Sequence, residues 1–337
     1  SRMASDLLTY PLFDIDSSNS FRSSGSSETP MRVTPSMAPN HISAVIILSE
    51  VLYHQRIKTG DSGFYHPKQG YGAVVAHSER VGKALDSAVR NSVCGKDVAV
   101  AFSGGLDSGL VAALASKYAN SVVLYTVGSD GSYDMVNSEK DHSKLGLPWR
   151  RIRLHEGNIG IILREMVRVT RTTSPLTLSF EVPMFCVTKG SAERTILGGM
   201  GSDELFAGYH KYIGMQEDEF LTKSAEDMER LLTEVAEHED RAADFFGKVI
   251  LRPFTDPEVI KAALSIPFSI LEPKDEGSRK SVLKELASDM GLDFLAAKSK
   301  KAAQYGSGTT DLIKASAKRR GMTQSQYISD ICSEEQY

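Results

Sequence analysis

The stretch Ser103-Gly104-Gly105-Leu106-Asp107-Ser108 decides the fold of this 337-residue chain. It follows Val98–Phe102, a short apolar run typical of a buried parallel strand. It leads into leucines that recur every four residues, a spacing that predicts a helix. Two glycines let the backbone turn and approach a ligand closely, and the free N–H groups at a helix start attract an anion. The stretch therefore predicts a loop that binds a polyphosphate, with the hydroxyls of Ser103 and Ser108 as further donors.

Asp107 distinguishes this loop from two better-known phosphate loops. The chain contains no G-x-x-x-x-G-K-[ST], and no G-x-G-x-x-G follows an expected strand. A bare carboxylate beside phosphates would be repelled, so Asp107 implies a bridging cation, and oxygen-rich surroundings favour Mg²⁺. A simple Gly-Ser turn is the alternative. Six specified residues in a strand–turn–helix context favour the phosphate site.

Apolar periodicity predicts strands alternating with helices between residues 78 and 205. This alternation is typical of a doubly wound, mostly parallel α/β sheet with helices on both faces. We expect strands over 98–102, 122–127, 150–154 and 195–197, and helices over 81–93 (with Ser78 as a possible N-cap), 106–118, 137–145, 158–170 and 181–193.

The strand pattern ends near residue 205, so we expect an all-helical C-terminal extension packed on the sheet. Ser224 and Ser278 are expected to begin two of its helices. Towards the N-terminus, a Ser-, Pro- and Asn-rich composition predicts a flexible arm. The expected organisation is a flexible arm (1–40), a short N-terminal segment with a helix over 44–52 (41–77), an α/β domain (78–215) and a helical region (216–337).

Composition narrows the class of protein. Hydrophobic residues make up 41% and charged residues 24%, with a net charge of −4. Because no basic stripe occurs, we do not expect a nucleic-acid partner. The three cysteines (Cys94, Cys186 and Cys332) lie far apart, which argues against a disulfide framework or zinc site. No apolar run is long enough to cross a membrane and none reads as a signal peptide, so we expect a cytoplasmic protein without a membrane partner.

Two motifs carry a resemblance to known proteins. Residues 103–108 resemble the PP-loop of the ATP pyrophosphatases, which have an adenine nucleotide alpha hydrolase-like (HUP-type) fold. The string Gly198-Gly199-Met200-Gly201-Ser202-Asp203-Glu204-Leu205-Phe206-Ala207-Gly208-Tyr209 is similar to the asparagine synthetase signature S-G-E-G-[AS]-D-E-L-F-G-G-Y. Arg252-Pro253-Phe254-Thr255-Asp256 resembles that family's R-x-P-F-L-D, one residue shorter. The resemblance covers about residues 80–310, the synthetase domain.

The resemblance implies ATP and Mg²⁺ as ligands. ATP would lie on Ser103–Ser108 and Gly199, with its ring held by the backbone of Val127 and Gly128. Asp107 and Asp203 would share one Mg²⁺, provided that the first and fourth strands are neighbours. Sites of this topology lie where the strand order reverses.

Further residues receive roles from the same resemblance. Lys301 resembles the lysine of the late K-x-x-F segment that reaches the phosphates, although an exposed surface charge is an equal alternative. Asp107, Asp203, Glu204 and Lys301 form the expected catalytic set. Met200, Gly201 and Lys280 are weaker candidates for the substrate pocket.

The implied reaction forms an amide: a carboxylate, with aspartate first, is converted to an acyl-adenylate with release of pyrophosphate and then takes up ammonia. The first cysteine is Cys94, so we do not expect glutamine hydrolysis by an N-terminal thiolate. Ammonia would come from solution or from a separate glutaminase subunit.

Met200 stands where the signature has Glu, and Gly198 replaces a Ser. Methionine neither accepts a proton nor hydrogen-bonds strongly. Two alternatives therefore stay open. One is the same chemistry on another carboxylate, such as a specialised metabolite, another amino acid or a modified nucleoside. The other is an ATP-binding relative without turnover.

Overall fold

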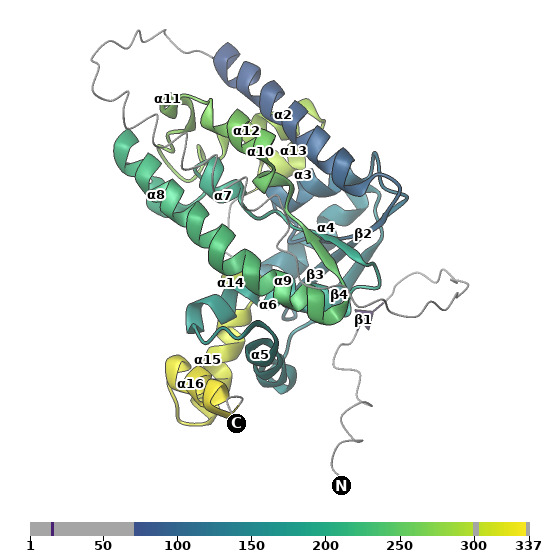
Figure 1. Ribbon diagram of the computed structural model, residues 1–337, viewed down its shortest axis with the longest axis vertical. Coiled ribbons are helices and arrows are strands. Elements are labelled where there is room, and N and C mark those ends of the chain that lie inside the picture. The colour runs from purple at the N-terminus through teal and green to yellow at the C-terminus, as the bar shows by residue number, and fades with distance from the viewer. Residues whose placement is uncertain (1–14, 17–70, 299–302, 335–337) are drawn as a thin grey trace.

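Within the part of the chain that the structure describes, six strands form one sheet in the order β1-β4-β3-β2-β5-β6 (Figure 1). The computed structural model describes residues 15–16, 71–298 and 303–334. β1 runs antiparallel to β4, and the other neighbours are parallel. The strands are β1 (Ile15–Asp16), β2 (Asp97–Ala101), β3 (Ser121–Gly128), β4 (Trp149–Arg153), β5 (Thr195–Leu197) and β6 (Val249–Leu251).

The strand order reverses at β2. Val98 of β2 lies in register with Val122 of β3 on one side and with Thr195 of β5 on the other. The first and fourth predicted strands are therefore neighbours, which was the condition for their two turns to meet. Because parallel strands end at the same edge, the loops after β2 and β5 emerge side by side at the position where such sheets bind ligands.

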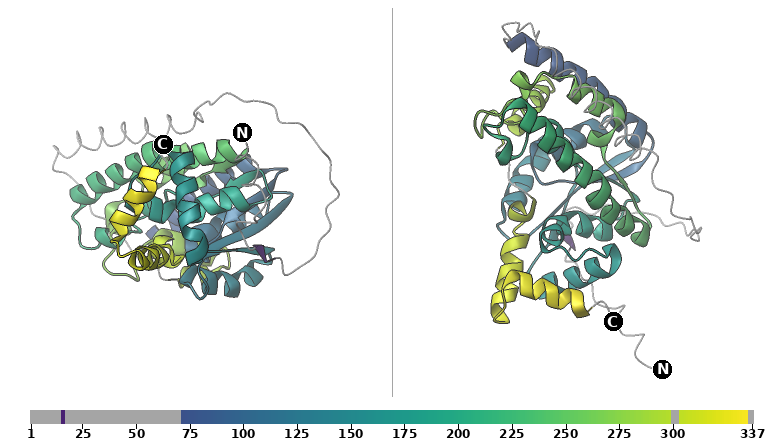
Figure 2. Two further views of the ribbon diagram at one scale, coloured as in Figure 1. Left: turned by 90° about the horizontal axis from the view of Figure 1, so that it is seen from below. Right: turned by 60° about the vertical axis from the view of Figure 1, so that its left-hand side comes forward.

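Helices cover both faces of the sheet (Figure 2). Adjacent residues of β2 face opposite sides, so Val98 and Val100 join one apolar core and Ala99 joins the other. The helices are α2 (Tyr71–Val93), α3 (Leu106–Ala115), α4 (Tyr133–Leu145), α5 (Glu156–Thr170), α6 (Pro175–Gly190), α7 (Ser202–Leu205), α8 (Glu217–Arg230), α9 (Ala236–Phe246), α10 (Pro257–Leu264), α11 (Phe268–Leu271), α12 (Ser281–Asp289), α13 (Asp293–Ala296), α14 (Ala303–Gly306), α15 (Thr309–Arg319) and α16 (Gln324–Glu334).

Three short helices join these elements: η1 (His210–Tyr212) and η3 (Pro253–Thr255) are 3₁₀ turns, and η2 (Leu231–Val235) is a single π-helical turn between α8 and α9. The first core contains side chains of α2, α3, α10 and α12, and the second contains side chains of α5, α6, α9, α15 and α16. Figure 1 shows α2 and α16 at opposite ends of the molecule. The sheet and its loops lie between these two groups of helices.

All four predicted strands are confirmed, and their predicted ends agree with the observed ends to within one residue. The all-helical prediction for the C-terminal part is wrong at β6, which pairs with β5 as a fifth parallel strand. Three residues are too few to show the alternation of apolar and polar side chains that predicts a strand. Residues 249–251 form a strand because they pair with β5. β1 was not predicted either. The rest of residues 1–70, including the expected helix over 44–52, lies outside the described residues.

Three predicted helix caps are wrong. Ser78 lies within α2, where its hydroxyl donates to Val75 O and to Asp289 Oδ2 of α12. Ser224 lies inside α8, which begins seven residues earlier at Glu217. Ser278 accepts hydrogen bonds from backbone N–H groups in the preceding turn. For Ser78 and Ser278 a tertiary or turn contact uses the hydroxyl that the local sequence suggested as a cap.

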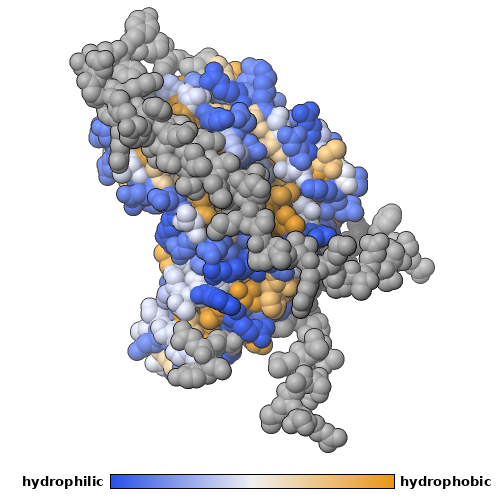
Figure 3. Space-filling model, in the orientation of Figure 1, coloured by the Kyte–Doolittle hydropathy of each residue, from blue (hydrophilic) through white to orange (hydrophobic). Residues whose placement is uncertain are grey.

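The surface mixes hydrophilic side chains with smaller apolar patches over the face in Figure 3. Within residues 71–298 and 303–334, none of the helices combines the length and hydropathy needed to span a bilayer.

A buried acid–base pair joins α6 to α9. Glu181 Oε1 lies 3.0 Å from His238 Nδ1, and the Glu181 side chain is only 4% exposed. Burial raises the pKa of the Glu181 carboxyl to about 7. The Glu181 carboxylate, which can accept a hydrogen bond from His238 Nδ1, raises the pKa of the His238 imidazole above its ordinary value. At both groups the folded protein therefore binds a proton more tightly than the unfolded chain does.

We expect this pair to make stability depend on pH. Because both folded-state pKa values are raised, their contribution is complete at low pH and is lost as the pH rises. For Glu181 the loss covers the range from about pH 5 through 7, at up to about 1.4 kcal/mol per pH unit. Urea unfolding of the wild type and Glu181→Gln across this range measures it. Parallel pH profiles for the two proteins would contradict the assignment.

Candidate functional site

The loop between β2 and α3 is closed by its own serines. Ser108 Oγ lies 3.3 Å from Ser103 Oγ and accepts from the Ser103 N–H, while the Gly105 N–H donates to Ser103 Oγ. Gly104 has φ +71°, and a Cβ there would lie 2.7 Å from the Ser138 N of α4. Only glycine suits this position. The N-terminus of α3 therefore opens onto a tight, preformed turn.

The turn between β5 and α7 lies against this loop. A Cβ at Gly199 would come within 3.0 Å of the Asp107 Cβ, and Gly201 adopts φ +95° to begin α7. Small residues thus allow two turns from distant parts of the sequence to touch. The structure brings the two predicted glycine-rich motifs together at the reversal of strand order.

Asp107 and Asp203 converge on a single cation, the ammonium of Lys280. Its Nζ lies 2.6 Å from both Asp107 carboxylate oxygens and 2.8 Å from Asp203 Oδ1. Ser202 Oγ accepts a further bond of 3.0 Å. The Lys280 side chain is 5% exposed, and the two carboxylates are 16% and 13% exposed. The two aspartates are therefore within reach of one common ion.

The backbone around Lys280 is shaped for this contact. Lys280 has φ +58°, an unfavourable left-handed conformation for a residue with a side chain, directly before α12. Arg279 Nη1 donates to Gly208 O at 2.8 Å. A Cβ at Gly208 would lie 2.3 Å from Lys280 Cε and 2.1 Å from Asp203 Oδ1. Non-glycine residues held in such conformations often mark functional sites.

The donor set fits a magnesium ion. Two carboxylates already surround one positive charge, and the Lys280 ammonium stands where a metal would interact with both. Among the described residues no three His, Cys, Asp or Glu side chains gather around one point. A metal here would take its remaining ligands from phosphate oxygens and water, which is the usual binding mode of Mg²⁺.

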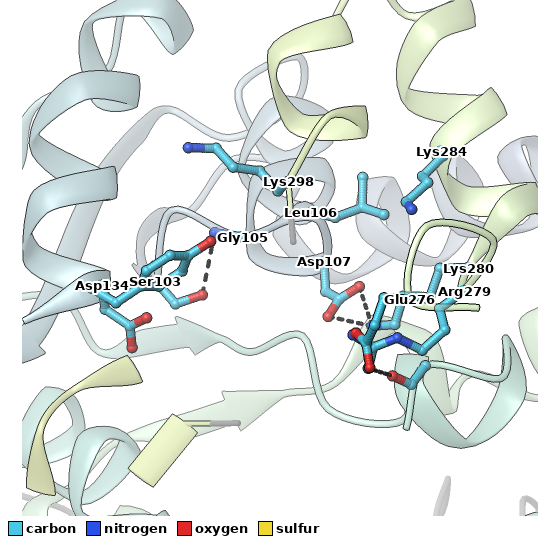
Figure 4. Close-up of a pocket in the computed structure, with 12 residues that line it drawn as sticks. Ser103, Gly105, Leu106, Asp107, Asp134, Glu276, Arg279, Lys280, Lys284 and Lys298 are labelled. Atoms are coloured by element: carbon cyan, nitrogen blue, oxygen red, sulfur yellow. Dashed lines mark hydrogen bonds and ion pairs between the residues drawn. The ribbon is translucent and has the colours of Figure 1, made fainter. Parts of the chain in front are cut away.

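A small cavity of about 60 Å³ beside the phosphate loop is rich in cations (Figure 4). Four basic side chains line it: Arg279, Lys280, Lys284 and Lys298. Figure 4 shows Arg279 and Lys280 beside Asp107, with Lys298 on the far side of the loop. Burial lowers the pKa of Lys284. Asp107, Asp134 and Glu276 line the cavity too, so its basic side chains exceed its acidic ones by one, a balance that suits an anion such as a polyphosphate bound with a cation.

A second cavity of about 450 Å³ shares Ser103, Asp107 and Asp134 with the first. It reaches from Val127 at the end of β3 to Met200 and the helices α6 and η2. Glu204 also lines it, is 2% exposed, and accepts a 2.6 Å hydrogen bond from the Tyr209 hydroxyl. Burial and the Glu204 charge raise the pKa of Tyr209 above its ordinary value.

Most predicted site residues lie on these cavities. Met200, Gly201, Glu204 and Val127 line the large one, whereas Gly128 packs against Ser132 and bonds Leu154 N through its carbonyl. Lys301 lies outside the described residues. Sequence reasoning missed Arg279, Lys284, Lys298 and Asp134. Lys298 lies in a basic run of the sequence with Lys300 and Lys301, but the other three carry no local signal.

Comparison with known proteins agrees with this geometry. Residues 80–221 match the model of the family described as asparagine synthase. This part of the chain belongs to the asparagine synthase family. A putative glutamine-hydrolyzing asparagine synthetase of Methanocaldococcus jannaschii is 30% identical over 287 residues, covering 73% of this chain and 53% of its own.

More distant asparagine synthetases match as well. A probable one from Acanthamoeba polyphaga mimivirus is 26% identical, covering 60% of this chain and 38% of its own. One from Brassica oleracea is 26% identical, covering 62% and 39%. The chain thus spans about half the length, or less, of these relatives. A solved structure of NMN synthetase from Francisella tularensis has a TM-score of 0.35 at 12% identity, covering 77% of this chain and 92% of its own.

Lys280→Met should destabilise the ligand-free protein by about 3 kcal/mol, because it leaves two partly buried carboxylates without their shared counter-charge. Urea unfolding in EDTA measures this loss. Millimolar Mg²⁺ should restore part of it by binding between Asp107 and Asp203.

Lys284→Met is the matched control, since Lys284 lies on α12 one helical turn after Lys280 and its Nζ donates to Gly277 O. It should show no such metal dependence. Equal stabilisation of the wild type and Lys280→Met by Mg²⁺ would contradict the assignment of a metal position between the aspartates.

Proposed function

We propose that this chain is an ATP-dependent, amide-forming ligase of the asparagine synthetase type, which activates a carboxylate as an acyl-adenylate. One observation carries the proposal. Two aspartates from two glycine-rich turns share one cation at the reversal of strand order, directly beside a phosphate-type loop. The membership of residues 80–221 in the asparagine synthase family supports it.

ATP would lie with its phosphates on Ser103–Ser108 and its ring beside the backbone of Val127 and Gly128. Asp107 and Asp203 would hold Mg²⁺, which when bound neutralises charge on the β- and γ-phosphates. Lys280 would then give up its place between the carboxylates and face the phosphates together with Arg279. Oriented cations of this kind stabilise charge that develops during bond cleavage.

The first step joins a carboxylate oxygen of the acid to the α-phosphorus of ATP. The bond from the α-phosphorus to the bridging oxygen breaks, and pyrophosphate leaves with both electrons into the small cationic cavity. Lys298 there is held by Asn137 Oδ1 at 2.8 Å and by Asp141, so it is fixed before the charge appears. Lys301 remains a predicted further cation.

The second step forms the amide. The ammonia nitrogen attacks the acyl carbon, the bond from that carbon to the AMP oxygen breaks, and AMP leaves. The nitrogen must lose a proton, and Met200 cannot accept it. Glu204 lines the same cavity as Met200, and we propose it as the acceptor. Its bond from Tyr209 positions the carboxylate.

The amine donor would be ammonia, from solution or from a separate glutaminase, and the reaction would take place in the cytoplasm. Aspartate is the first acid to test, because the names of the relatives point to it. A different carboxylate is the second candidate, and Met200 in the cavity wall is the observation that favours it.

Pyrophosphate release tests the proposal directly. With ATP, Mg²⁺, ammonium and a panel of carboxylic acids, at least one acid should stimulate release. Asp107→Asn should lower this rate by ~100-fold or more, because it removes one of the two carboxylates that position the metal.

Asp130→Asn serves as the control on an exposed loop, where the Asp130 side chain is 82% exposed, and should leave the rate unchanged. Tight ATP binding without pyrophosphate release under any acid would instead identify a nucleotide-binding relative without turnover.

A further inference from the structure

The large cavity has an apolar wall that aspartate chemistry does not require. Helix α6 and the π-turn η2 face each other across it. The side chains that line this part are largely apolar and include Leu176, Phe180, Met184, Met200, Leu231 and Val235. Apolar surface in a cavity gains free energy only when an apolar group covers it.

This wall begins at the reacting centre. A Cβ at Gly198 would lie 2.7 Å from the Met184 methyl group, so Met184 packs against the turn that also approaches Asp107. Met200 follows in the same turn. At the other end Leu176 is 56% exposed. The apolar surface therefore runs from the phosphate loop outward to the surface.

The π-turn gives this surface its second side. Leu231–Val235 interrupts the α-helical ladder between α8 and α9, and single π-turns occur preferentially at functional sites because they cost stability. Leu231 and Val235 lie about one turn apart, and both face the cavity. The interruption thus presents two apolar side chains opposite α6.

The charged groups of this part of the cavity bind other groups of the chain. Lys211 forms an ion pair of 2.5 Å with Asp227, and Arg230 one of 3.1 Å with Glu234. Aspartate would bring an ammonium and a second carboxylate beside the reacting one. Burying those charges without partners costs several kcal/mol. An ammonium would find acidic side chains such as Glu204 on the same cavity, so the paired cations and the apolar wall disfavour mainly the second carboxylate.

Resting on the proposed function, we infer that the acid activated here carries an apolar chain, an alkyl or aryl group of about four to eight carbons, that lies between α6 and η2. Its carboxylate would reach the α-phosphorus beside Gly199. The apolar chain would pack on Met184, Phe180 and Leu231. Substrate selection would then come from buried apolar area rather than from ion pairs.

A chain-length series tests the inference. Acetate, butanoate, hexanoate, phenylacetate and aspartate are each supplied with ATP, Mg²⁺ and ammonium, and kcat/KM for pyrophosphate release is measured. From acetate to hexanoate, kcat/KM should rise roughly fourfold for each methylene buried, and hexanoate should exceed aspartate at least tenfold. A flat series with aspartate preferred overturns the inference and leaves the proposed function intact.

Leu231→Asn should flatten the series, since it places an amide in the apolar wall. Ile161→Asn is the matched control: Ile161 is an apolar residue of α5 that is 46% exposed and does not line this cavity. It should leave the slope unchanged. An equal loss of slope in both variants would also overturn the inference.

Direct binding separates the two proposals. Each acid is titrated calorimetrically into the wild type with Mg²⁺ and α,β-methylene ATP, which cannot release pyrophosphate. If no acid gives turnover but hexanoate binds at least tenfold tighter than aspartate, the ligase proposal fails and the apolar site stands. If aspartate binds tighter, the apolar site is refuted whatever the turnover.

Discussion

Two ionised carboxylates repel each other inside a protein unless a positive charge lies between them. Asp107 and Asp203 come from turns about a hundred residues apart, and the ammonium of Lys280 holds them together. Every other feature of the site depends on this arrangement. The parallel pairing of β2 with β5 aligns the turns, and the glycines within them remove the side chains that would keep the carboxylates apart.

The same constraint explains why α12 belongs to the site although it lies far along the chain. Lys280, the residue directly before α12, has a left-handed backbone that directs its side chain towards both aspartates. Gly208 leaves room for this side chain. The packing of α12 on α2 and α3 through Val282, Leu283 and Leu286 fixes that helix in the first core. The burial of these apolar side chains of α12 thus fixes the position of the Lys280 charge, which lies only a few residues earlier in the chain.

The sequence alone predicted the four strands around the site and both turns, because each motif combines a strand end with glycines and a carboxylate. The convergence of their acids was an implication of the family resemblance. The sequence did not predict β6, whose three residues become a strand only beside β5. Nor did it place Arg279, Lys284 and Lys298, since a basic side chain usually faces solvent, whether it lies on a helix, as Lys284 does, or next to one. Only the packing of α12 and of the segment after α13 turns these cations inward. The apolar wall was missed for a similar reason: residues of α6 that line it are indistinguishable in sequence from core.

The two cavities meet along Ser103, Asp107 and Asp134 and then diverge. A leaving group that departs into the cationic side does not stand in the way of an amine that arrives from the other. Under the proposed reaction the second half could therefore proceed while the first product is still bound. The positions of the two cavities would then determine the order of product release. Pyrophosphate would stay bound behind the adenylate and keep water away from the activated acyl group.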